Sequence, residues 1–401
     1  MGRGSLRLVL ALTMLVAHGC ARDLQSRQNS VHPPVVPLTQ AETRELLDSN
    51  QFAELDRRFS AVQRGYRDGS ITDEDLRAAF RVFYPTNAAL EQKYTAWIAQ
   101  YPKSYVARLA RGINYKKVGM ERRGGNSISN TTEAQLGDME SAFTRSSGDL
   151  SASLNLDNKP LLTYAQEMDI ASYLGEDERI RTILEAAIKV DPTNIIVREK
   201  YMGTLEPRWG GSVEAMHAFL EESKQAGVSA AHLQSLEGII LEDQAHTEKE
   251  AGDYAAAERD YRKAVALGNE DCLLCFAETL TQVGKFADAI PIYSKFLASN
   301  PNDADTLANR SNAYMQTGMA REGIKDLQAA AEAGSAYAQC ELGRYYMIGV
   351  PGILLPDPTA GMSWFEKSAA QGYPAGQENL RRARKLFVPQ SKASQAATLS
   401  N

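Results

Sequence analysis

Residues 238–334 carry apolar side chains at helical spacing, in successive segments that are separated by glycines. The glycines Gly252, Gly284 and Gly318 are 32 and 34 positions apart. A small residue follows each glycine after five positions and a large one after nine: Ala257, Ala289 and Gly323, then Tyr261, Tyr293 and Leu327. This spacing predicts amphipathic helices, and the regular period predicts an array of helix pairs joined by glycine turns.

The same pattern continues less regularly towards the N-terminus. Gly175 is followed at helical spacing by Ile180, Leu184 and Ala187, and then by Pro192, which lacks an amide hydrogen and ends a helix. A helix is expected near 133–156, after a long polar loop that begins at Arg122. We therefore expect the folded part to be all-α, an α-solenoid of stacked helix pairs with degenerate repeats in its N-terminal half.

The C-terminal half of the chain resembles two families of helical repeats. Residues 238–334, with their turn glycines and with Pro301 after the second pair, resemble tetratricopeptide repeats. Residues 335–387, with Leu342-Gly343 and Trp364-Phe365, resemble the related Sel-one-like repeat. Both resemblances imply antiparallel helix pairs that stack into a solenoid, with a protein or a peptide bound on its concave face.

The N-terminal half resembles a bacterial family of unknown function that often precedes tetratricopeptide repeats. The resemblance rests on Ala110-Arg111-Gly112, on Arg122-Arg123-Gly124-Gly125 and on Tyr201-Met202. Its most specific piece is the string Pro207-Arg208-Trp209-Gly210-Gly211-Ser212. We expect this degenerate helical domain to cover residues 39–230, and the resemblance implies no catalytic residue.

The first 20 residues have the features of an export signal. Arg3 and Arg7 precede ten apolar residues, Leu8 to Ala17, which suit a signal and are too short to span a membrane. Cys20 ends a segment that resembles a lipoprotein cleavage box, so we expect lipidation at Cys20 and a periplasmic protein anchored in the outer membrane. The alternative is an ordinary cleaved signal in which Cys20 has no special role.

Composition is ordinary for a folded soluble protein. The 401 residues are 43% hydrophobic and 23% charged, which excludes a largely disordered chain and a polytopic membrane protein. The net charge of −6 does not favour nucleic acid as a partner. The proline-containing segment 21–38 is expected to be a tether, and the polar segment 388–401 a frayed tail.

Motifs of cofactor or catalytic sites are absent from the sequence. It contains no phosphate-binding or dinucleotide-binding glycine loop, no zinc-binding histidine pair and no nucleophile elbow. His217, His232 and His246 are expected on the surfaces of three helices. We therefore expect no cofactor and a non-enzymatic scaffold or adaptor that binds a protein. The alternative is an enzyme, or an enzyme subunit, with a site formed by the loops 122–126 and 208–212.

Cys272 and Cys275 lie at i and i+3, where a helix capped by Asn269 or Asp271 would begin. Side chains at this spacing are about 5–6 Å apart, which is within the range of a disulfide. Three interpretations stay open at this point: two buried free thiols, a local disulfide, and a redox pair activated by the helix N-terminus. A single pair of this kind cannot supply the four ligands of a structural zinc site.

Two arginine–glycine segments could form ligand loops. Arg122 and Arg123 beside a glycine-rich turn could bind phosphate, and Arg208 with Trp209 could hold an anion or stack on a ligand. We favour a structural interpretation, in which the two following glycines supply positive φ for a tight turn and Trp209 fills the space between repeats. Trp209→Ala would then reduce stability by about 3–5 kcal/mol.

The tetratricopeptide resemblance also implies which side chains face the groove. Four positions of each first helix point to the concave side. The members of this set that we assign to the partner groove are Glu242, His246, Lys249, Asp271, Leu274, Glu278, Asp305, Asn312 and Met315. Four of them are acids and one is a lysine, which favours a basic or polar partner and salt-dependent binding. The alternative is that these acids only keep the face solvated.

Overall fold

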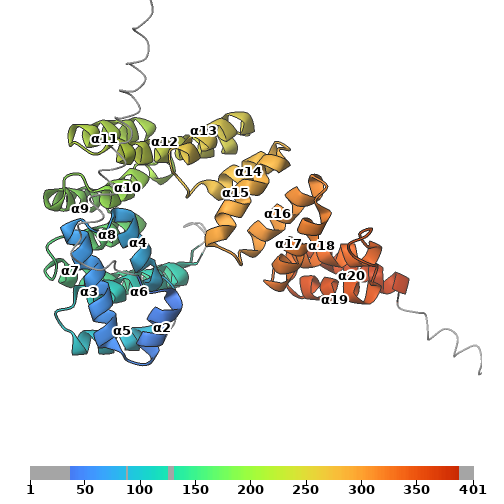
Figure 1. Ribbon diagram of the computed structural model, residues 1–401, viewed down its shortest axis with the longest axis horizontal. Helices are drawn as coiled ribbons and strands as arrows, with labels where there is room; N and C mark the ends of the chain where they lie inside the picture. The colour runs from blue at the N-terminus through green and yellow to red at the C-terminus, as the bar shows by residue number, and fades with distance from the viewer. Residues whose placement is uncertain (1–36, 87–88, 125–130, 388–401) are drawn as a thin grey trace, which may run out of the picture. The chain divides into compact units, whose positions relative to one another are not determined.

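The computed structural model describes residues 37–86, 89–124 and 131–387. Within these ranges the structure is helical, and the pairing of Val350 with Leu354 is an isolated bridge. The predicted all-α fold of stacked helix pairs is confirmed (Figure 1). The chain divides into two compact units, Met1–His232 and Leu233–Asn401, which we call unit 1 and unit 2. Cys20 and the expected tail lie outside the described residues.

Unit 1 consists of short and medium helices joined by turns. In chain order these are α2 (Gln40–Asp48), α3 (Phe52–Asp68), α4 (Asp73–Phe80), η1 (Arg81–Phe83), α5 (Leu90–Gln100), α6 (Tyr105–Arg123), α7 (Glu133–Leu154), α8 (Leu161–Leu174), α9 (Asp177–Val190), α10 (Ile195–Thr204), η3 (Pro207–Trp209) and α11 (Val213–Gln225). α7 lies where a helix was expected, and its capping box of Thr132 and Gln135 explains why it begins there.

The core of unit 1 is rich in aromatic side chains. Trp97 of α5 is fully buried, and its ring centroid lies 6.3 Å from that of Phe83. Phe59 of α3 lies 4.7 Å from Phe83 and 5.5 Å from Phe80. Aromatic rings at these distances contribute stability beyond the area that they bury. This cluster therefore fixes α3, α4 and α5 against one another.

Unit 2 consists of consecutive antiparallel helix pairs. Its helices are α12 (Ala230–Glu250), which contains the division between the units, α13 (Tyr254–Ala266), α14 (Leu273–Gln282), α15 (Phe286–Ser299), α16 (Ala304–Gln316), α17 (Ala320–Glu332), α18 (Ala336–Ile348), α19 (Pro358–Ala370) and α20 (Pro374–Phe387). Gly252, Gly284 and Gly318 all have positive φ at the predicted turns. The repeat boundaries expected from the glycine spacing are therefore confirmed.

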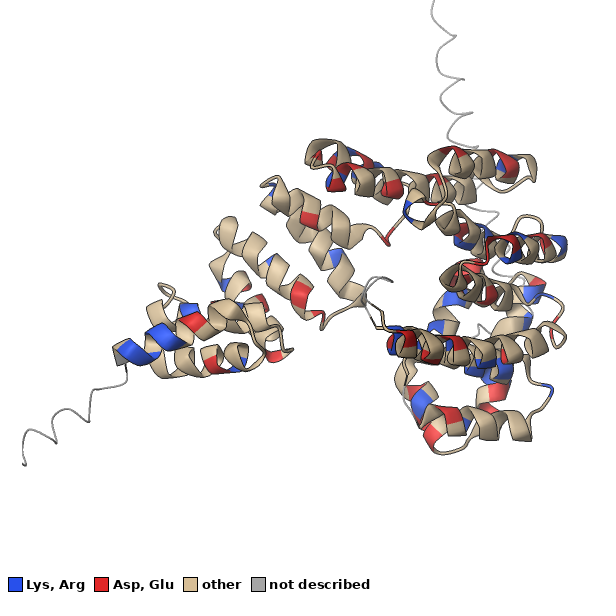
Figure 2. Cartoon of the chain, turned by 180° about the vertical axis from the view of Figure 1, so that it is seen from behind, with Lys and Arg blue, Asp and Glu red and all other residues tan. Residues whose placement is uncertain are grey.

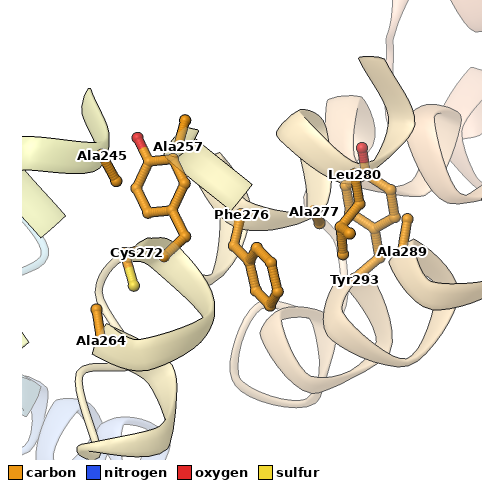
Figure 3. Packing of buried hydrophobic residues seen from close by; sticks show 10 residues of the cluster. Ala245, Ala257, Ala264, Cys272, Phe276, Ala277, Leu280, Ala289 and Tyr293 are labelled. Carbon is orange, nitrogen blue, oxygen red and sulfur yellow. The ribbon is translucent and has the colours of Figure 1, made fainter. Parts of the chain in front are cut away.

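The predicted small and large positions form the core between successive pairs. Figure 3 shows Ala257 of α13 and Ala289 of α15 in the same buried cluster as Phe276 and Tyr293. The two alanines are fully buried, and Tyr293 is 1% exposed. Small side chains allow these helices to approach closely, and the large side chains fill the space between neighbouring pairs. The periodicity of the sequence thus has a direct packing cause.

The two helices of the Sel-one-like pair cross closely at two glycines. A Cβ atom built on Gly343 of α18 would lie 2.7 Å from the Phe365 ring, and one on Gly361 of α19 would lie 2.9 Å from the Gly343 carbonyl oxygen. No larger residue fits at either position without a shift of the neighbouring helix. This reciprocal contact explains the small residues that characterise residues 335–387.

Candidate functional site

The first helix of each pair in unit 2 contacts the first helix of the next pair. α14 contacts α16, α16 contacts α18, and α18 contacts α20. The first helices therefore form one continuous layer, on which a partner could lie. We call the predicted groove residues on this layer the first-helix face of unit 2: Glu242, His246, Lys249, Asp271, Leu274, Glu278, Asp305, Asn312 and Met315.

Two of the four predicted acids are engaged inside the protein. Glu242 of α12 accepts a hydrogen bond of 2.7 Å from the Asn269 amide, which follows α13. Glu278 of α14 forms an ion pair of 2.9 Å with Lys249 of α12. Their charges stabilise contacts between neighbouring helices. These two acids therefore also hold contacts within unit 2, beside any role in binding a partner.

The accessible charge of this face is concentrated at two helix N-termini. Asp271 and Asp305 are both exposed, and Asp305 accepts a hydrogen bond of 3.4 Å from the Ser335 hydroxyl. His246 lies 3.2 Å from Glu250 of the same helix, and Asn312 is half-buried. Of these four side chains, the two acids are the most accessible.

Leu274 and Met315 contribute to packing within the unit. Leu274 packs against the buried cluster that contains Phe276. The Met315 sulfur lies 2.7 Å from where a Cβ atom of Gly323 in α17 would be, so Met315 occupies the space that this glycine leaves open. Both were expected to face a partner. Their contacts show that they also join the helices of unit 2.

Both cysteines of the Cys-x-x-Cys segment are free thiols. Cys272 is buried at the N-cap of α14, where its Sγ donates to the Asn269 carbonyl oxygen at 3.3 Å. Burial raises the pKa of Cys272 to about 12 and also raises the pKa of Cys275. A redox pair needs a stabilised thiolate, so the raised pKa values do not favour a redox pair. Of the two free thiols, Cys272 is buried as expected, whereas Cys275 is only half-buried. The expected side-chain cap from Asn269 or Asp271 is absent, because α14 begins only at Leu273.

The expectation that Trp209 is a buried wedge is wrong. Its side chain is 65% exposed, at the end of the short helix η3. Arg208 lies over the Trp209 ring at 5.9 Å and forms an ion pair of 2.5 Å with Glu206. The proline-initiated turn of η3 directs the indole towards solvent. Trp209 and Arg208 therefore form an exposed cation–π pair, a pairing suited to contact with another molecule.

The two glycines after Trp209 have different roles. Gly210 adopts a φ of 93°, as expected for the tight turn. Gly211 does not have positive φ, contrary to expectation. Instead, a Cβ atom on Gly211 would lie 2.0 Å from the Leu205 carbonyl oxygen. The second glycine is required by this close approach of the backbone.

Arg122 and Arg123 lie in a helix and not in a loop. α6 continues to Arg123, and Gly124 ends it with a φ of 77°. Cations in the last turn interact favourably with the helix dipole. The Arg123 carbonyl oxygen accepts a hydrogen bond of 3.3 Å from Gln135 of α7. The segment 125–130, part of the expected ligand loop, lies outside the described residues.

The histidines lie on fewer helices than expected. His217 lies on α11, whereas His232 and His246 share α12, so the three histidines occupy two helices and not three. In the described part of the chain, no group of three or more side chains is arranged to hold a metal ion. Nor does any helix in these ranges have the length and apolar character needed to span a membrane.

A cleft of about 460 Å³ lies in unit 1. Its lining comes from one side of α3, from the turn between α5 and α6, and from the loop between α7 and α8. Asp157 in the wall forms an ion pair of 2.6 Å with Arg67 and accepts a hydrogen bond of 3.1 Å from Gln63. These contacts hold α3 against the α7–α8 loop. None of the residues predicted for ligand binding lines this cleft.

The sequence analysis missed a group of charged side chains on the first helices of unit 1. α6 contacts α8, and α8 contacts α10. Asp169 of α8 forms ion pairs with Lys116 of α6 and with Lys200 of α10, the latter at 2.8 Å. The Lys116 side chain is 3% exposed. Burial alone would raise the pKa of Asp169, but the two lysines outweigh it and lower the pKa to about 2.

Lys117 lies beside these ion pairs. Its Nζ is 4.9 Å from the centre of the Tyr84 ring. Burial lowers the pKa of Lys117, and the nearby charges of Lys116 and Lys200 lower it further. Within the described residues no carboxylate forms an ion pair with Lys117. The adjacent lysines at 116 and 117 were the only sequence signal of this group, and their partners on α8 and α10 carry no motif.

The arginine of the Ala110-Arg111-Gly112 string has a structural role. Arg111 makes two hydrogen bonds to the Asp149 carboxylate of α7, at 2.6 and 2.8 Å. Arg108 donates to the same carboxylate at 2.9 Å, and the Asp149 side chain is 4% exposed. The two arginines satisfy a buried acid and join α6 to α7. Arg111 of this string thus serves the packing of the α6–α7 pair.

Comparison with family models found a match over residues 39–188, described as a domain of unknown function, DUF4034. The match lies inside unit 1 and includes the Ala110-Arg111-Gly112 string. It supports the expected family resemblance for this range. The string Pro207–Ser212 lies outside the matched residues, so its assignment to the family stays a prediction.

Several solved structures of helical-repeat proteins are similar to this chain. One is a protective antigen of uropathogenic Escherichia coli with an SLR fold. It is 15% identical, the match covers 90% of this chain and 86% of that chain, and the TM-score is 0.38. Another is a Sel1 repeat protein from Oxalobacter formigenes. It is 19% identical, the match covers 55% of this chain and 99% of that chain, and the TM-score is 0.32. The tetratricopeptide domain of P58(IPK) is 18% identical. The match covers 87% of this chain and 97% of that chain, with a TM-score of 0.25. The comparison with curated proteins found no match.

Proposed function

We propose that this protein is a non-enzymatic scaffold of the bacterial envelope that binds a partner protein through the first helices of its repeats. The observation that carries the proposal is the continuous layer formed by α14, α16, α18 and α20. Stacked first helices offer an extended surface, which suits a protein or a peptide better than a small molecule. The structure does not test the enzyme alternative, because the loops assigned to it include residues 125 and 126, outside the described ranges.

The first-helix face of unit 2 favours a basic or polar segment. Asp271, in the turn before α14, and Asp305 of α16 are both exposed. Acids at the rim of an interface mainly raise the association rate and make it salt-dependent. Glu242 and Glu278 would be poor sites for a charge reversal, since both hold contacts inside unit 2. The two exposed acids are therefore the better targets.

We expect the double variant Asp271→Lys with Asp305→Lys to bind the partner at least about five-fold more weakly at low salt, because each reversal replaces an attraction by a repulsion. The measurement is capture from an envelope extract by the purified full chain, at low and at high salt. The matched control is Glu322→Lys with Glu332→Lys on the second helix α17, where both acids are exposed. This control variant changes the net charge of the chain by the same amount as Asp271→Lys with Asp305→Lys.

The two double variants separate the interpretations. Loss of capture at low salt in the first variant alone supports binding on the first-helix face. Equal loss in both variants would indicate a general charge effect. If neither variant differs from the parent chain at either salt concentration, this face does not bind the partner.

The envelope location is also a proposal, because the first 36 residues lie outside the described structure. It rests on the short apolar segment that ends at Cys20. We expect Cys20→Ser to move the protein from the membrane fraction to the soluble periplasmic fraction, because the lipid would be its only anchor. Intact mass of the parent chain should show the added lipid. A parent chain without lipid, together with an unchanged distribution of the variant, would contradict lipidation.

A further inference from the structure

The first helices of unit 1 carry more positive than negative charge. Lys116 and Lys200 form ion pairs with the Asp169 carboxylate, and Lys117 lies near Asp169 and near Glu121 of its own helix. Arg77 of α4 forms an ion pair with Glu199 of α10 and so adds no net charge. The chain as a whole has a net charge of −6. This local excess of cations is therefore opposite in sign to the protein that carries it. Figure 2 shows charges of both signs on the helices of the chain.

Among the described residues, Lys117 is the lysine of this group that forms no ion pair, and its ammonium lies over the Tyr84 ring. The charged groups that face it are Lys116 and Glu121 of its own helix, Asp169 of α8 and Lys200 of α10. Asp169 already pairs with the two other lysines, and Glu121 accepts a hydrogen bond from the Thr86 hydroxyl. A half-buried ammonium beside two like charges is stabilised when an anion binds next to it.

The dimensions of the surface favour a chain segment over a small ion. Packed helices have their axes about 8–10 Å apart, so α6, α8 and α10 together span about 20 Å. An extended chain covers that distance with about six residues, at about 3.3 Å per residue. One phosphate could reach the cations of one helix or two neighbouring helices, whereas an extended segment could contact all three.

Two tyrosines at this surface are available for contacts with a polypeptide. Tyr84 and Tyr173 are each 36% exposed. Tyr84 contacts Lys117 through its ring, and Tyr173 lies near Asp169 and Lys200. Tyrosine is enriched at the centres of protein interfaces because its ring buries a large area and its hydroxyl forms hydrogen bonds.

We propose that the first helices of unit 1 bind an extended Asp/Glu-rich protein segment, whose carboxylates lie against Lys117 and Lys200 and whose backbone packs on Tyr84 and Tyr173. This inference rests on the proposed scaffold function and names the chemistry of a partner segment at a second face. The acidic segment is attracted locally although the whole protein is negatively charged. Its binding therefore depends on this group and not on general electrostatic attraction.

The test uses the purified full chain and a fluorescently labelled hexaglutamate peptide. Binding is measured by fluorescence polarisation, with labelled hexalysine as the probe of opposite charge. We expect Lys117→Met to weaken hexaglutamate binding by about five-fold, the effect of one partly exposed charge pair. Lys117→Met with Lys200→Met should weaken it by more than ten-fold if the two effects add. The matched control is Lys103→Met, which removes an exposed lysine of the same unit.

A second readout separates a binding role from a structural role of Lys117. Acylation of its amine is followed against pH by peptide mapping, with and without hexaglutamate. The bound peptide should move the midpoint for Lys117 to higher pH, because carboxylates favour the ammonium form. The midpoint for Lys103 should not move. A purely structural Lys117 would show no such shift, even if its replacement altered folding.

Three results would overturn the proposal: no binding of hexaglutamate by the parent chain, equal binding by Lys117→Met and Lys103→Met, or displacement of the peptide by inorganic phosphate at the peptide's own concentration. The last result would identify a small-anion site. Since the probe is a defined peptide, the outcome does not depend on capture through unit 2. If hexaglutamate does not bind, the capture result for unit 2 is unaffected. If capture through unit 2 fails, the peptide result for unit 1 is equally unaffected.

Discussion

Trp97→Ala is expected to lower the free energy of unfolding of unit 1 by about 3–5 kcal/mol, the usual cost of removing a large aromatic side chain from a core. Trp97 is fully buried and packs against Phe83. Its removal leaves a cavity between α5 and η1 that the surrounding rings cannot close without moving. Thermal and urea unfolding of the full chain, followed by circular dichroism, measure the effect.

Trp209→Ala is the matched control, because it makes the same change at a side chain that is 65% exposed. We expect its effect to stay within about 0.5 kcal/mol, as is usual for surface positions. Comparable losses in the two variants would contradict the burial described for Trp97 and Trp209. A loss for Trp209→Ala alone would restore the buried wedge that was expected from the sequence.

Asp169→Asn is expected to destabilise unit 1 by about 3–5 kcal/mol, because it leaves the buried ammonium of Lys116 without its charged partner. The side chains of Lys116 and Asp169 are 3% and 20% exposed. The substitution keeps the shape of the side chain, so the loss reports on charge and not on volume. Adding Lys116→Met should recover part of the stability, since no charge is then left buried. An Asp169→Asn variant as stable as the parent chain would contradict the ion pair.

The same ion pair gives a pH dependence of known sign. The pKa of Asp169 is lowered from 3.8 to about 2 in the folded protein. A carboxyl with a lowered pKa stabilises the fold above its unfolded pKa, and this contribution is lost as the pH falls through the folded pKa. We therefore expect the parent chain to lose about 2 kcal/mol more than Asp169→Asn between pH 4 and pH 2. Parallel losses in that interval would contradict the assignment.

The repeat pattern was readable from the sequence because each of its elements has a local cause. Gly252 and Gly318 occupy turns with positive φ, which few other residues adopt. Ala257 and Ala289 lie where helices approach closely, and both are fully buried. Such requirements recur in every repeat. A single sequence therefore displays them as a period, and the helices of unit 2 could be predicted.

The candidate sites were harder to predict, because they depend on contacts between distant residues. Nothing in the sequence near Glu242 shows that Asn269 donates a hydrogen bond to it. Trp209 was assigned to the core from its residue type, whereas the short helix that ends there directs it to solvent. Lys116 and Asp169 come from helices whose repeats are too degenerate to align, so their pairing was not visible.

The central claim, that a partner binds along the first helices, is tested most directly by amide hydrogen exchange of the full chain with and without the captured partner. We predict slower exchange in α14, α16 and α18, and unchanged exchange in the second helices α13, α15 and α17. Protection confined to the second helices, or bound partner without protection of any first helix, would contradict the claim.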